Sequence, residues 1–274
     1  MSAKVIGSVN QKGGQGKSQG VHAMAMVLSK VMKKKVLVID FDPQGAQTTL
    51  FGLEDNILEE HPESSVSLVF EKRIDEIVPL PISKRVDAVL SDYSLTEYSE
   101  RSIKNKENLL KKLVNRFRDE YSYILIDSQP TVGTLMSSVV LASDDLFVPV
   151  KTNLLDEKGT LGFFDECLAV IDAYDKEIGK ITLVPNLYES TVNDNKESLS
   201  NIKNNFPAYL HREYRGEVVV TKPIPKRSLF GAAASDGEIN NILKFIEKKS
   251  RSNMDILVLL KEITKEVTQG ASNG

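Results

Sequence analysis

The sequence predicts an α/β fold with a single doubly wound, mostly parallel sheet and helices on both faces. Short unbroken aliphatic runs, such as the one at residues 36–39, recur along most of the 274 residues. Such runs are typical of parallel strands that are buried on both sides, and stretches long enough for helices separate them. Because the alternation contains no repeat, linker or break in composition, we expect one domain over residues 1–274.

The elements are expected in a regular order. Strands are predicted at residues 4–9, 36–39, 86–90, 123–126, 146–150, 181–184 and 218–220. Helices are predicted at residues 21–31, 97–117, 157–173 and 194–209. The intervening segment 52–81 is irregular and contains three prolines, so we expect a surface connection with one short helix there.

The C-terminal stretch, residues 240–267, is helical by pattern. Ile256, Leu260, Ile263 and Val267 recur at helical spacing and fall on one face. The last 25 residues carry balanced charges. They therefore lack the basic excess that would hold such a face to anionic lipid. We therefore expect helices at about 237–268 to pack on the sheet.

Composition excludes several classes of function. A hydrophobic content of 41% and a charged content of 27% are ordinary for a globular protein, and the net charge of −3 rules out a uniformly basic surface for nucleic acid. The single cysteine, Cys167, cannot form an internal disulfide or a cysteine-rich metal site. Apolar runs are too short to span a bilayer, so we expect a cytoplasmic protein.

Residues 12–18 form a glycine-rich loop between the first predicted strand and the first helix. Glycines let successive backbone N–H groups point at phosphate oxygens, and the helix N-terminus adds its positive dipole end. Lys17 supplies a charge for the β- and γ-phosphates of a nucleotide, and the hydroxyl of Ser18 is placed to bind magnesium. The sequence therefore predicts a nucleotide and Mg²⁺ site at this loop.

Acidic residues end two of the predicted strands. Asp40 and Asp42 end the second strand, and Asp127 ends the run at residues 123–126. The carboxyl ends of strands in such sheets face the crevice where ligands bind. Asp127 has the position of a Walker B acid, and we expect it to hold magnesium through water.

The loop Lys12-Gly13-Gly14-Gln15-Gly16-Lys17-Ser18 has Gln11 where the usual Walker pattern has glycine, and it carries an additional lysine. In this it resembles the deviant Walker A loop of the ParA/MinD superfamily of dimerising ATPases. The resemblance implies that ATP is the nucleotide, that Lys12 reaches across a homodimer to the partner's nucleotide, and that Asp42 orients the attacking water. Asp40 would then join Asp127 in the magnesium shell through water.

Other positions match the family less closely. Gln15 and Gln19 stand where the family commonly has Val and Thr, and Gln129 stands within the segment that usually reads Pro-Pro. The resemblance implies that Gln15 and Gln19 still line the nucleotide. It also implies that Asn186 reads the adenine ring, with Pro223 and Pro225 near the base.

A local basic excess points to DNA. Residues 196–227 carry seven basic and three acidic side chains within a protein of net charge −3. No recognition helix is apparent, so contacts would be with phosphates and insensitive to sequence. The predicted contacts are Arg212, Arg215, Lys222, Lys226 and Arg227.

The resemblance favours a DNA-partition ATPase that is nucleoid-associated when ATP is bound and is stimulated by a ParB-type centromere-binding protein. Two alternatives stay open. A MinD-like membrane-positioning ATPase needs a basic amphipathic tail, and a metabolic ligase of dethiobiotin synthetase type normally lacks the lysine at the loop entrance. A nitrogenase iron protein needs cluster cysteines that this chain lacks.

Overall fold

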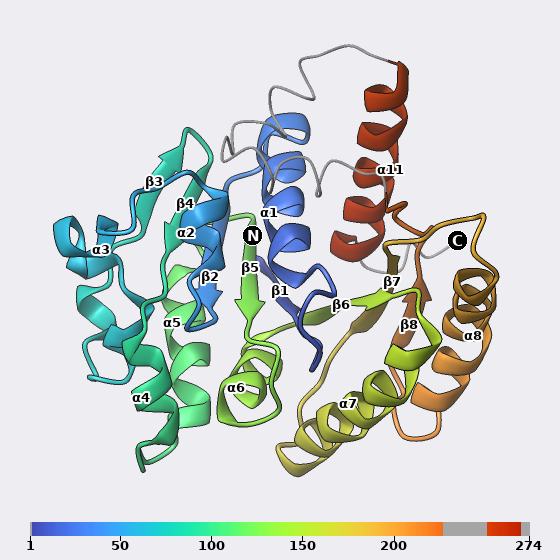
Figure 1. Cartoon of the computed structure of the whole chain (residues 1–274). Helices are drawn as coiled ribbons and strands as arrows, with labels where there is room; N and C mark the ends of the chain where they lie inside the picture. Colours follow the sequence, from blue (N-terminus) through green and yellow to red (C-terminus); the bar gives the residue numbers. More distant parts are fainter. Residues whose placement is uncertain (1, 227–250, 270–274) are drawn as a thin grey trace.

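One eight-stranded sheet forms the centre of the computed structural model, which describes residues 2–226 and 251–269 (Figure 1). The strand order is β3-β4-β2-β5-β1-β6-β7-β8. The strands are β1 Lys4–Ser8, β2 Val36–Phe41, β3 Leu80–Ser83, β4 Val86–Val89, β5 Tyr123–Ser128, β6 Asp145–Lys151, β7 Lys180–Asn186 and β8 Glu217–Val220. All neighbours pair in parallel except β3, which is antiparallel to β4. The predicted mostly parallel α/β fold is confirmed.

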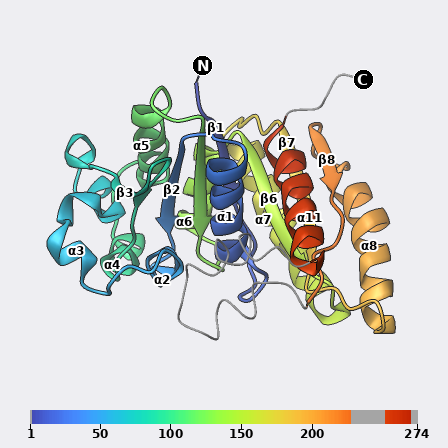
Figure 2. The ribbon, with the colours of Figure 1, turned by 90° about the horizontal axis from the view of Figure 1, so that it is seen from above.

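Helices cover both faces of this sheet (Figure 2). The longer helices are α1 Lys17–Met26, α4 Ser94–Glu100, α5 Leu109–Phe117, α6 Thr134–Ala142, α7 Leu154–Ala173, α8 Asn193–Leu210 and α11 Arg251–Thr268. One apolar cluster joins α1 and α11 to one face, and another joins α5, α6, α7 and α8 to the opposite face. Burial on both faces explains why the strands are continuous aliphatic runs.

The central strand β1 lies at the point where the chain changes direction across the sheet. From β1 the chain passes through α1 to β2 on one side, and from β5 it passes through α6 to β6 on the other. Crevices at the carboxyl ends of strands beside such a switch point are where open α/β sheets bind ligands. The glycine-rich loop follows β1 directly, so the fold places it at this crevice.

The segment 52–81 is more ordered than we expected. It contains the short helices α3 Ile57–Glu60, η2 Pro62–Ser64, η3 Val66–Val69 and η4 Ile74–Glu76, and it ends in the edge strand β3. Pro81 lies in the edge strand β3, which has a neighbouring strand on one side only. Proline has no backbone N–H, and on the open side of β3 that group would have no partner, so the strand tolerates the residue. The predicted surface connection was therefore wrong for residues 80 and 81, where β3 begins.

The single helix predicted over residues 97–117 is also wrong. The structure divides it into α4, the short helix η5 Lys106–Asn108 and α5. Asn105 adopts a left-handed backbone conformation, with φ of 58°, and a helix cannot continue through such a residue. Helix α6 was missed altogether.

The C-terminal prediction holds within the residues that the structure describes. Leu260, Ile263 and Val267 of α11 are buried against α1 and the sheet, whereas the side chain of Ile256 and residues 237–250 lie outside the described part. Cys167 is buried and free, as expected. Among residues 2–226 and 251–269, no helix has both the length and the apolar character needed to cross a membrane.

Candidate functional site

The glycine-rich loop turns from the end of β1 into the first turn of α1. Gly14 and Gly16 have positive φ angles of 72° and 98°, a conformation that favours glycine. A Cβ atom on Gly16 would also collide with the side-chain amide of Asn186, which lies directly against the loop. A Cβ atom on Gly13 would meet nothing within 4 Å. Backbone conformation and close packing thus fix the loop at Gly16.

Gly16→Ala is expected to lower the thermal stability of the protein, because alanine strains the backbone and displaces the Asn186 amide. We expect a fall in Tm of about 5 °C, which corresponds to roughly 2 kcal/mol for a chain of this size. Gly13→Ala is the matched control in the same loop and should change Tm by less than about 1 °C. Equal melting of both variants, measured by calorimetry, would contradict this account of the loop.

Gln15 and Asn186 brace the loop from the neighbouring strands. The Oε1 atom of the buried Gln15 accepts a hydrogen bond from the backbone N–H of Lys151 at 2.6 Å. The Nδ2 atom of Asn186 donates to the backbone oxygen of Gln15 at 2.8 Å. These contacts attach the loop to β6 and β7, so Gln15 stabilises the conformation of the loop. Gln19 lies on the first turn of α1.

Lys17 is the buried lysine of the loop. It is only 6% exposed, and its Nζ atom donates to the backbone oxygen of Lys12 at 3.4 Å. Burial lowers the pKa of the Lys17 ammonium, and the nearby charges of Asp127 and Asp42 oppose that effect. The lysine and the acids at the ends of the two strands therefore lie close enough for their charges to interact.

Lys12 lies apart from this group and has a partner in its own chain. Its Nζ atom is 2.7 Å from Oδ1 of Asp156 and donates to the backbone oxygen of Leu155 at 3.1 Å. Both partners belong to the first turn of α7, and the side chains of Lys12 and Asp156 are 32% and 20% exposed. Lys12 thus has a role within its own subunit that the sequence did not reveal, and Asp156 is a site residue that sequence reasoning missed.

Asp40 and Asp127 lie side by side on β2 and β5. The two residues are direct partners in the parallel register, and both are completely buried. Burial is the largest cause that raises the pKa of each carboxyl group above its usual range, and proximity to Asp127 adds to it for Asp40. Hydrogen bonds from the Gln47 and Ser18 side chains oppose the rise at Asp127. A nearby cation would favour the ionised form of both acids.

The chemistry of the donors fits magnesium, which prefers oxygen ligands and keeps several of its waters. Within the part of the chain that the structure describes, the buried Oδ1 atom of Asp127 has no hydrogen-bond partner, so it can accept a hydrogen bond from a bound water. Asp40 differs, because its two oxygens accept from the backbone N–H groups of Asp42 at 3.1 Å and Gln47 at 2.9 Å. Asp40 thereby shapes the segment after β2, while Ser18 and Asp127 stay available for the ion.

Asp42 lies directly after the end of β2 and is buried near Lys17 and Asp127. Its side chain is 7% exposed, and Oδ1 accepts a hydrogen bond from the backbone N–H of Gln44 at 3.0 Å. The short helix α2 Ala46–Leu50 follows at once. Its residue Gln47 is fully buried and donates to Oδ2 of Asp127 at 2.9 Å, a contact that the sequence gave no reason to expect.

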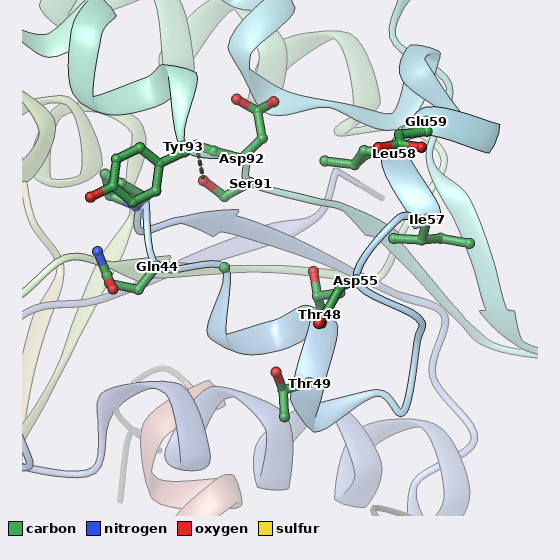
Figure 3. A pocket seen from close by; sticks show the side chains of 12 residues that line it. Gln44, Thr48, Thr49, Asp55, Ile57, Leu58, Glu59, Ser91, Asp92 and Tyr93 are labelled. Carbon is green, nitrogen blue, oxygen red and sulfur yellow. Dashed lines mark hydrogen bonds between the residues drawn. The ribbon is translucent and has the colours of Figure 1, made fainter.

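A cavity of about 470 Å³ lies on the side of α2 that faces the loop between β4 and α4 (Figure 3). Gln44, Thr48 and Thr49 come from one side of it, and Asp92 and Tyr93 from the other. Tyr93 is 75% exposed, so the cavity opens to solvent. The segment that carries Asp42 therefore has the acids of the sheet on one side and this cavity on the other.

The two segments that were predicted to lie near the base are paired with each other. Ile224 donates its backbone N–H to Pro185, Tyr188 donates to Ile224, and Lys226 donates to Tyr188. Pro225, Tyr188 and Lys226 line a cavity of about 250 Å³. Pro223 and Pro225 lie on either side of Ile224, which is hydrogen-bonded to Pro185 near the end of β7. Both segments therefore lie at the carboxyl edge of the sheet, near Asn186.

The predicted DNA-contacting residues do not form one continuous patch. Arg212 and Arg215 precede β8, whereas Lys222 and Lys226 follow it, and the four residues of β8 separate the two pairs by roughly 13 Å at about 3.3 Å per residue. Lys222 pairs with Glu262 at 2.8 Å, and Lys226 pairs with Glu189 at 2.5 Å. Arg212 stacks over the ring of Tyr209. Arg227 lies outside the described residues.

Comparison with known proteins gives the class of this site. Residues 3–180 match the model of the AAA domain family, which is more than half of the chain. The chain belongs to this family, and it is an ATPase of the ParA/MinD type. The predicted family is therefore confirmed.

Individual relatives share the coarse features. The chain is 28% identical over 152 residues to the chromosome-partitioning ATPase Soj of Treponema pallidum, covering 54% of this chain and 57% of that protein. A plasmid partition protein of Borrelia burgdorferi bound to AMPPNP superposes with a TM-score of 0.74 at 20% identity, over 96% of this chain and 99% of that one.

A metabolic enzyme shares the fold as well. Cobyrinic acid a,c-diamide synthase of Mycobacterium smegmatis, with bound ADP and magnesium, has a TM-score of 0.69 at 22% identity, over 91% of this chain and 97% of that one. Solved structures with this fold thus include one with ADP and magnesium and one with AMPPNP.

Proposed function

We propose that the protein is an ATP-dependent DNA-partition ATPase. Two ATP–Mg²⁺ molecules are held between the subunits of a homodimer, the dimer binds non-specific DNA, and a ParB-type centromere-binding protein stimulates hydrolysis and release. The observation that carries the proposal is that the two lysines of the loop have different surroundings. Lys17 is buried with Asp42 and Asp127, whereas Lys12 lies outside that group at a partly exposed surface.

Within one subunit the residues have separable tasks. The backbone of residues 13–18 and the ammonium of Lys17 bind the phosphates, and a bound magnesium ion would supply further positive charge there. Ser18 and Asp127 hold the hydrated ion, with Asp40 acting indirectly through the segment that it shapes. Asp42, which lies directly after β2, orients the attacking water. Asn186, with Pro223 and Pro225, borders the base.

Lys12 completes the neighbouring site. Its ion pair with Asp156 is partly exposed, and pairs of this kind contribute only about 0.2–1 kcal/mol. The phosphates of a second subunit's nucleotide offer a stronger negative charge, so the lysine can exchange one partner for the other. This step makes nucleotide binding and dimerisation interdependent, as a DNA-partition cycle requires.

The basic residues after β8 are suited to DNA phosphates. Lys222 and Lys226 are exposed, and their ion pairs with glutamates are of the weak, screened kind that a phosphate can replace. Both follow β8 at the edge of the sheet where the nucleotide is proposed to bind, so nucleotide binding can change their surroundings. Arg212 and Arg215 lie beyond the opposite end of β8.

DNA affinity is therefore expected to require ATP, to be similar for unrelated duplexes and to fall steeply with salt. A dimer with about three phosphate contacts per subunit should give a slope near −5 in log affinity against log salt. Lys222→Ala/Lys226→Ala should make the slope smaller by roughly 3 to 4 for every sequence tested, since four contacts are lost per dimer. Gel shifts at several salt concentrations measure this.

The matched control is Arg212→Ala/Arg215→Ala, which removes the same charge at the other end of β8 and should change the slope less. Affinity for an ATP analogue is measured for both variants, because Lys226 borders the predicted base site. Binding that ignores the nucleotide state, or no binding with ATP at low salt, would contradict partition. Liposome binding and ligase assays would then test the MinD-like and metabolic alternatives, the second of which the cobyrinic acid synthase fold favours.

A further inference from the structure

Gln47 joins three parts of the candidate site from a fully buried position on α2. Its side-chain nitrogen donates to Oδ2 of Asp127 and to the backbone oxygen of Ser18, both at 2.9 Å. Its backbone N–H donates to Oδ2 of Asp40, also at 2.9 Å. The residue therefore touches both strand-end acids and the residue that follows the loop lysine.

These contacts fix the orientation of the Gln47 amide. The Nε2 atom carries two hydrogens, and both point at oxygen acceptors. Turning the amide over would place its own oxygen against a carboxylate and a carbonyl, which is unfavourable. The Oε1 atom must consequently point away from Asp127 and Ser18.

Both members of this hydrogen-bonded pair keep one unused acceptor. Among residues 2–226 and 251–269, no hydrogen-bond donor contacts the buried Oε1 atom of Gln47 or the buried Oδ1 atom of Asp127. A buried acceptor without a donor carries the penalty of its lost hydration, so two in adjacent side chains call for an explanation. What they lack is a donor, and the waters of a hydrated divalent cation are donors.

We propose that Gln47 is a positioning residue for the hydrated magnesium ion: it orients Asp127 through Nε2 and accepts a hydrogen bond from an ion-bound water through Oε1. The inference rests on the proposed ATP–Mg²⁺ function. A neutral amide suits this place, because it adds an acceptor without a further negative charge beside Asp40, Asp42 and Asp127. It also ties the ion to α2, whose residues Thr48 and Thr49 line the cavity in Figure 3.

The test uses Mn²⁺ as the probe and the full chain bound to a non-hydrolysable ATP analogue. Free Mn²⁺ is titrated by electron paramagnetic resonance, and broadening in ¹⁷O-labelled water reports the waters that the ion keeps. Gln47→Leu, which keeps the size but loses both polar atoms, should weaken Mn²⁺ binding about tenfold, as loss of an outer-shell partner typically does. Affinity for the analogue in the presence of EDTA should stay within about twofold of wild type.

Thr49→Val is the matched control, since it makes a polar-to-apolar change on the exposed side of the same helix and should leave Mn²⁺ affinity unaltered. If Gln47→Leu does not fold, Gln47→Asn keeps the amide on a shorter side chain and should weaken Mn²⁺ binding as well. An unchanged Mn²⁺ affinity in the Gln47 variants would overturn the inference, and so would a tighter one, which would mean that Gln47 competes with the ion. A wild-type protein that binds the analogue but no Mn²⁺, or binds neither, would instead overturn the proposed function.

Discussion

Lys17→Ala is expected to lose nucleotide binding, whereas Asp42→Ala is expected to bind nucleotide normally and to lose hydrolysis. The first change should weaken affinity for an ATP analogue at least about 100-fold, equivalent to about 2.7 kcal/mol. The second should leave that affinity within about threefold and slow turnover at least about 100-fold, as loss of a group that acts on the attacking water typically does. The pair thus separates binding from chemistry within one site.

The reason for the first result is the burial of Lys17. An ammonium that is 6% exposed, with its pKa lowered by desolvation, has little water to solvate its charge. Nucleotide phosphates would supply the compensating charge, so the lysine gains most when they bind. Removing it takes away the principal positive charge and leaves Asp42 and Asp127 to repel the phosphates.

The reason for the second result is the different place of Asp42. Its carboxylate lies just beyond the end of β2, where Oδ1 accepts a hydrogen bond from the backbone N–H of Gln44, a residue outside the glycine-rich loop. Binding is measured by fluorescence of a labelled analogue and turnover by phosphate release. Hydrolysis by Asp42→Ala at the wild-type rate would show that another acid orients the water, and normal binding by Lys17→Ala would contradict the assignment of the loop.

Most of the fold and the central acids were predictable because they depend on local pattern. Strands β2 and β5 are continuous aliphatic runs that end in Asp40 and Asp127, and a doubly wound sheet brings such ends together. The loop before α1 has its own spacing of glycines and lysines. In each case the residues that define the feature lie within about ten positions of one another in the sequence.

The features that were missed depend on contacts between distant residues or on uniform burial. Helix α6 is buried on nearly every side, so its sequence has no polar stripe to mark the helical period. Strand β3 is an edge strand with a proline, and its pattern is that of a loop. Gln47 and Asp127 are 80 positions apart, and their contact exists only because α2 folds back over the ends of β2 and β5.

The contact between Lys12 and Asp156 is of the same kind, and it changes what we expect of dimerisation. The residues are 144 positions apart, and from sequence Lys12 had no visible use in its own subunit. The structure shows the lysine held at the start of α7, beside Gly159, where an added Cβ would collide with the Lys12 side chain. To act on a partner's nucleotide, each subunit must first release Lys12 from Asp156.

Asp156→Asn is therefore expected to strengthen the ATP-dependent dimer, and Lys12→Ala to weaken it. Releasing two partly exposed ion pairs at about 0.5–0.7 kcal/mol each should tighten the dimer roughly 5- to 10-fold, because the folded monomer no longer competes for the lysine. Lys12→Ala removes two charge contacts across the interface and should weaken the dimer at least about tenfold. Sedimentation of each variant with a non-hydrolysable analogue gives the dissociation constants.

The double variant Lys12→Ala/Asp156→Asn decides between this competition and an unrelated effect of Asp156 on the interface. If the aspartate acts only by holding the lysine, the double variant must dimerise as weakly as Lys12→Ala, since no lysine remains to be released. Glu166→Gln removes an exposed charge from the same helix and should leave the dimer unchanged. A dimer that Asp156→Asn strengthens even without Lys12 would show that the acid repels the partner directly, and a monomer with every nucleotide would remove the basis for a role of Lys12 between subunits.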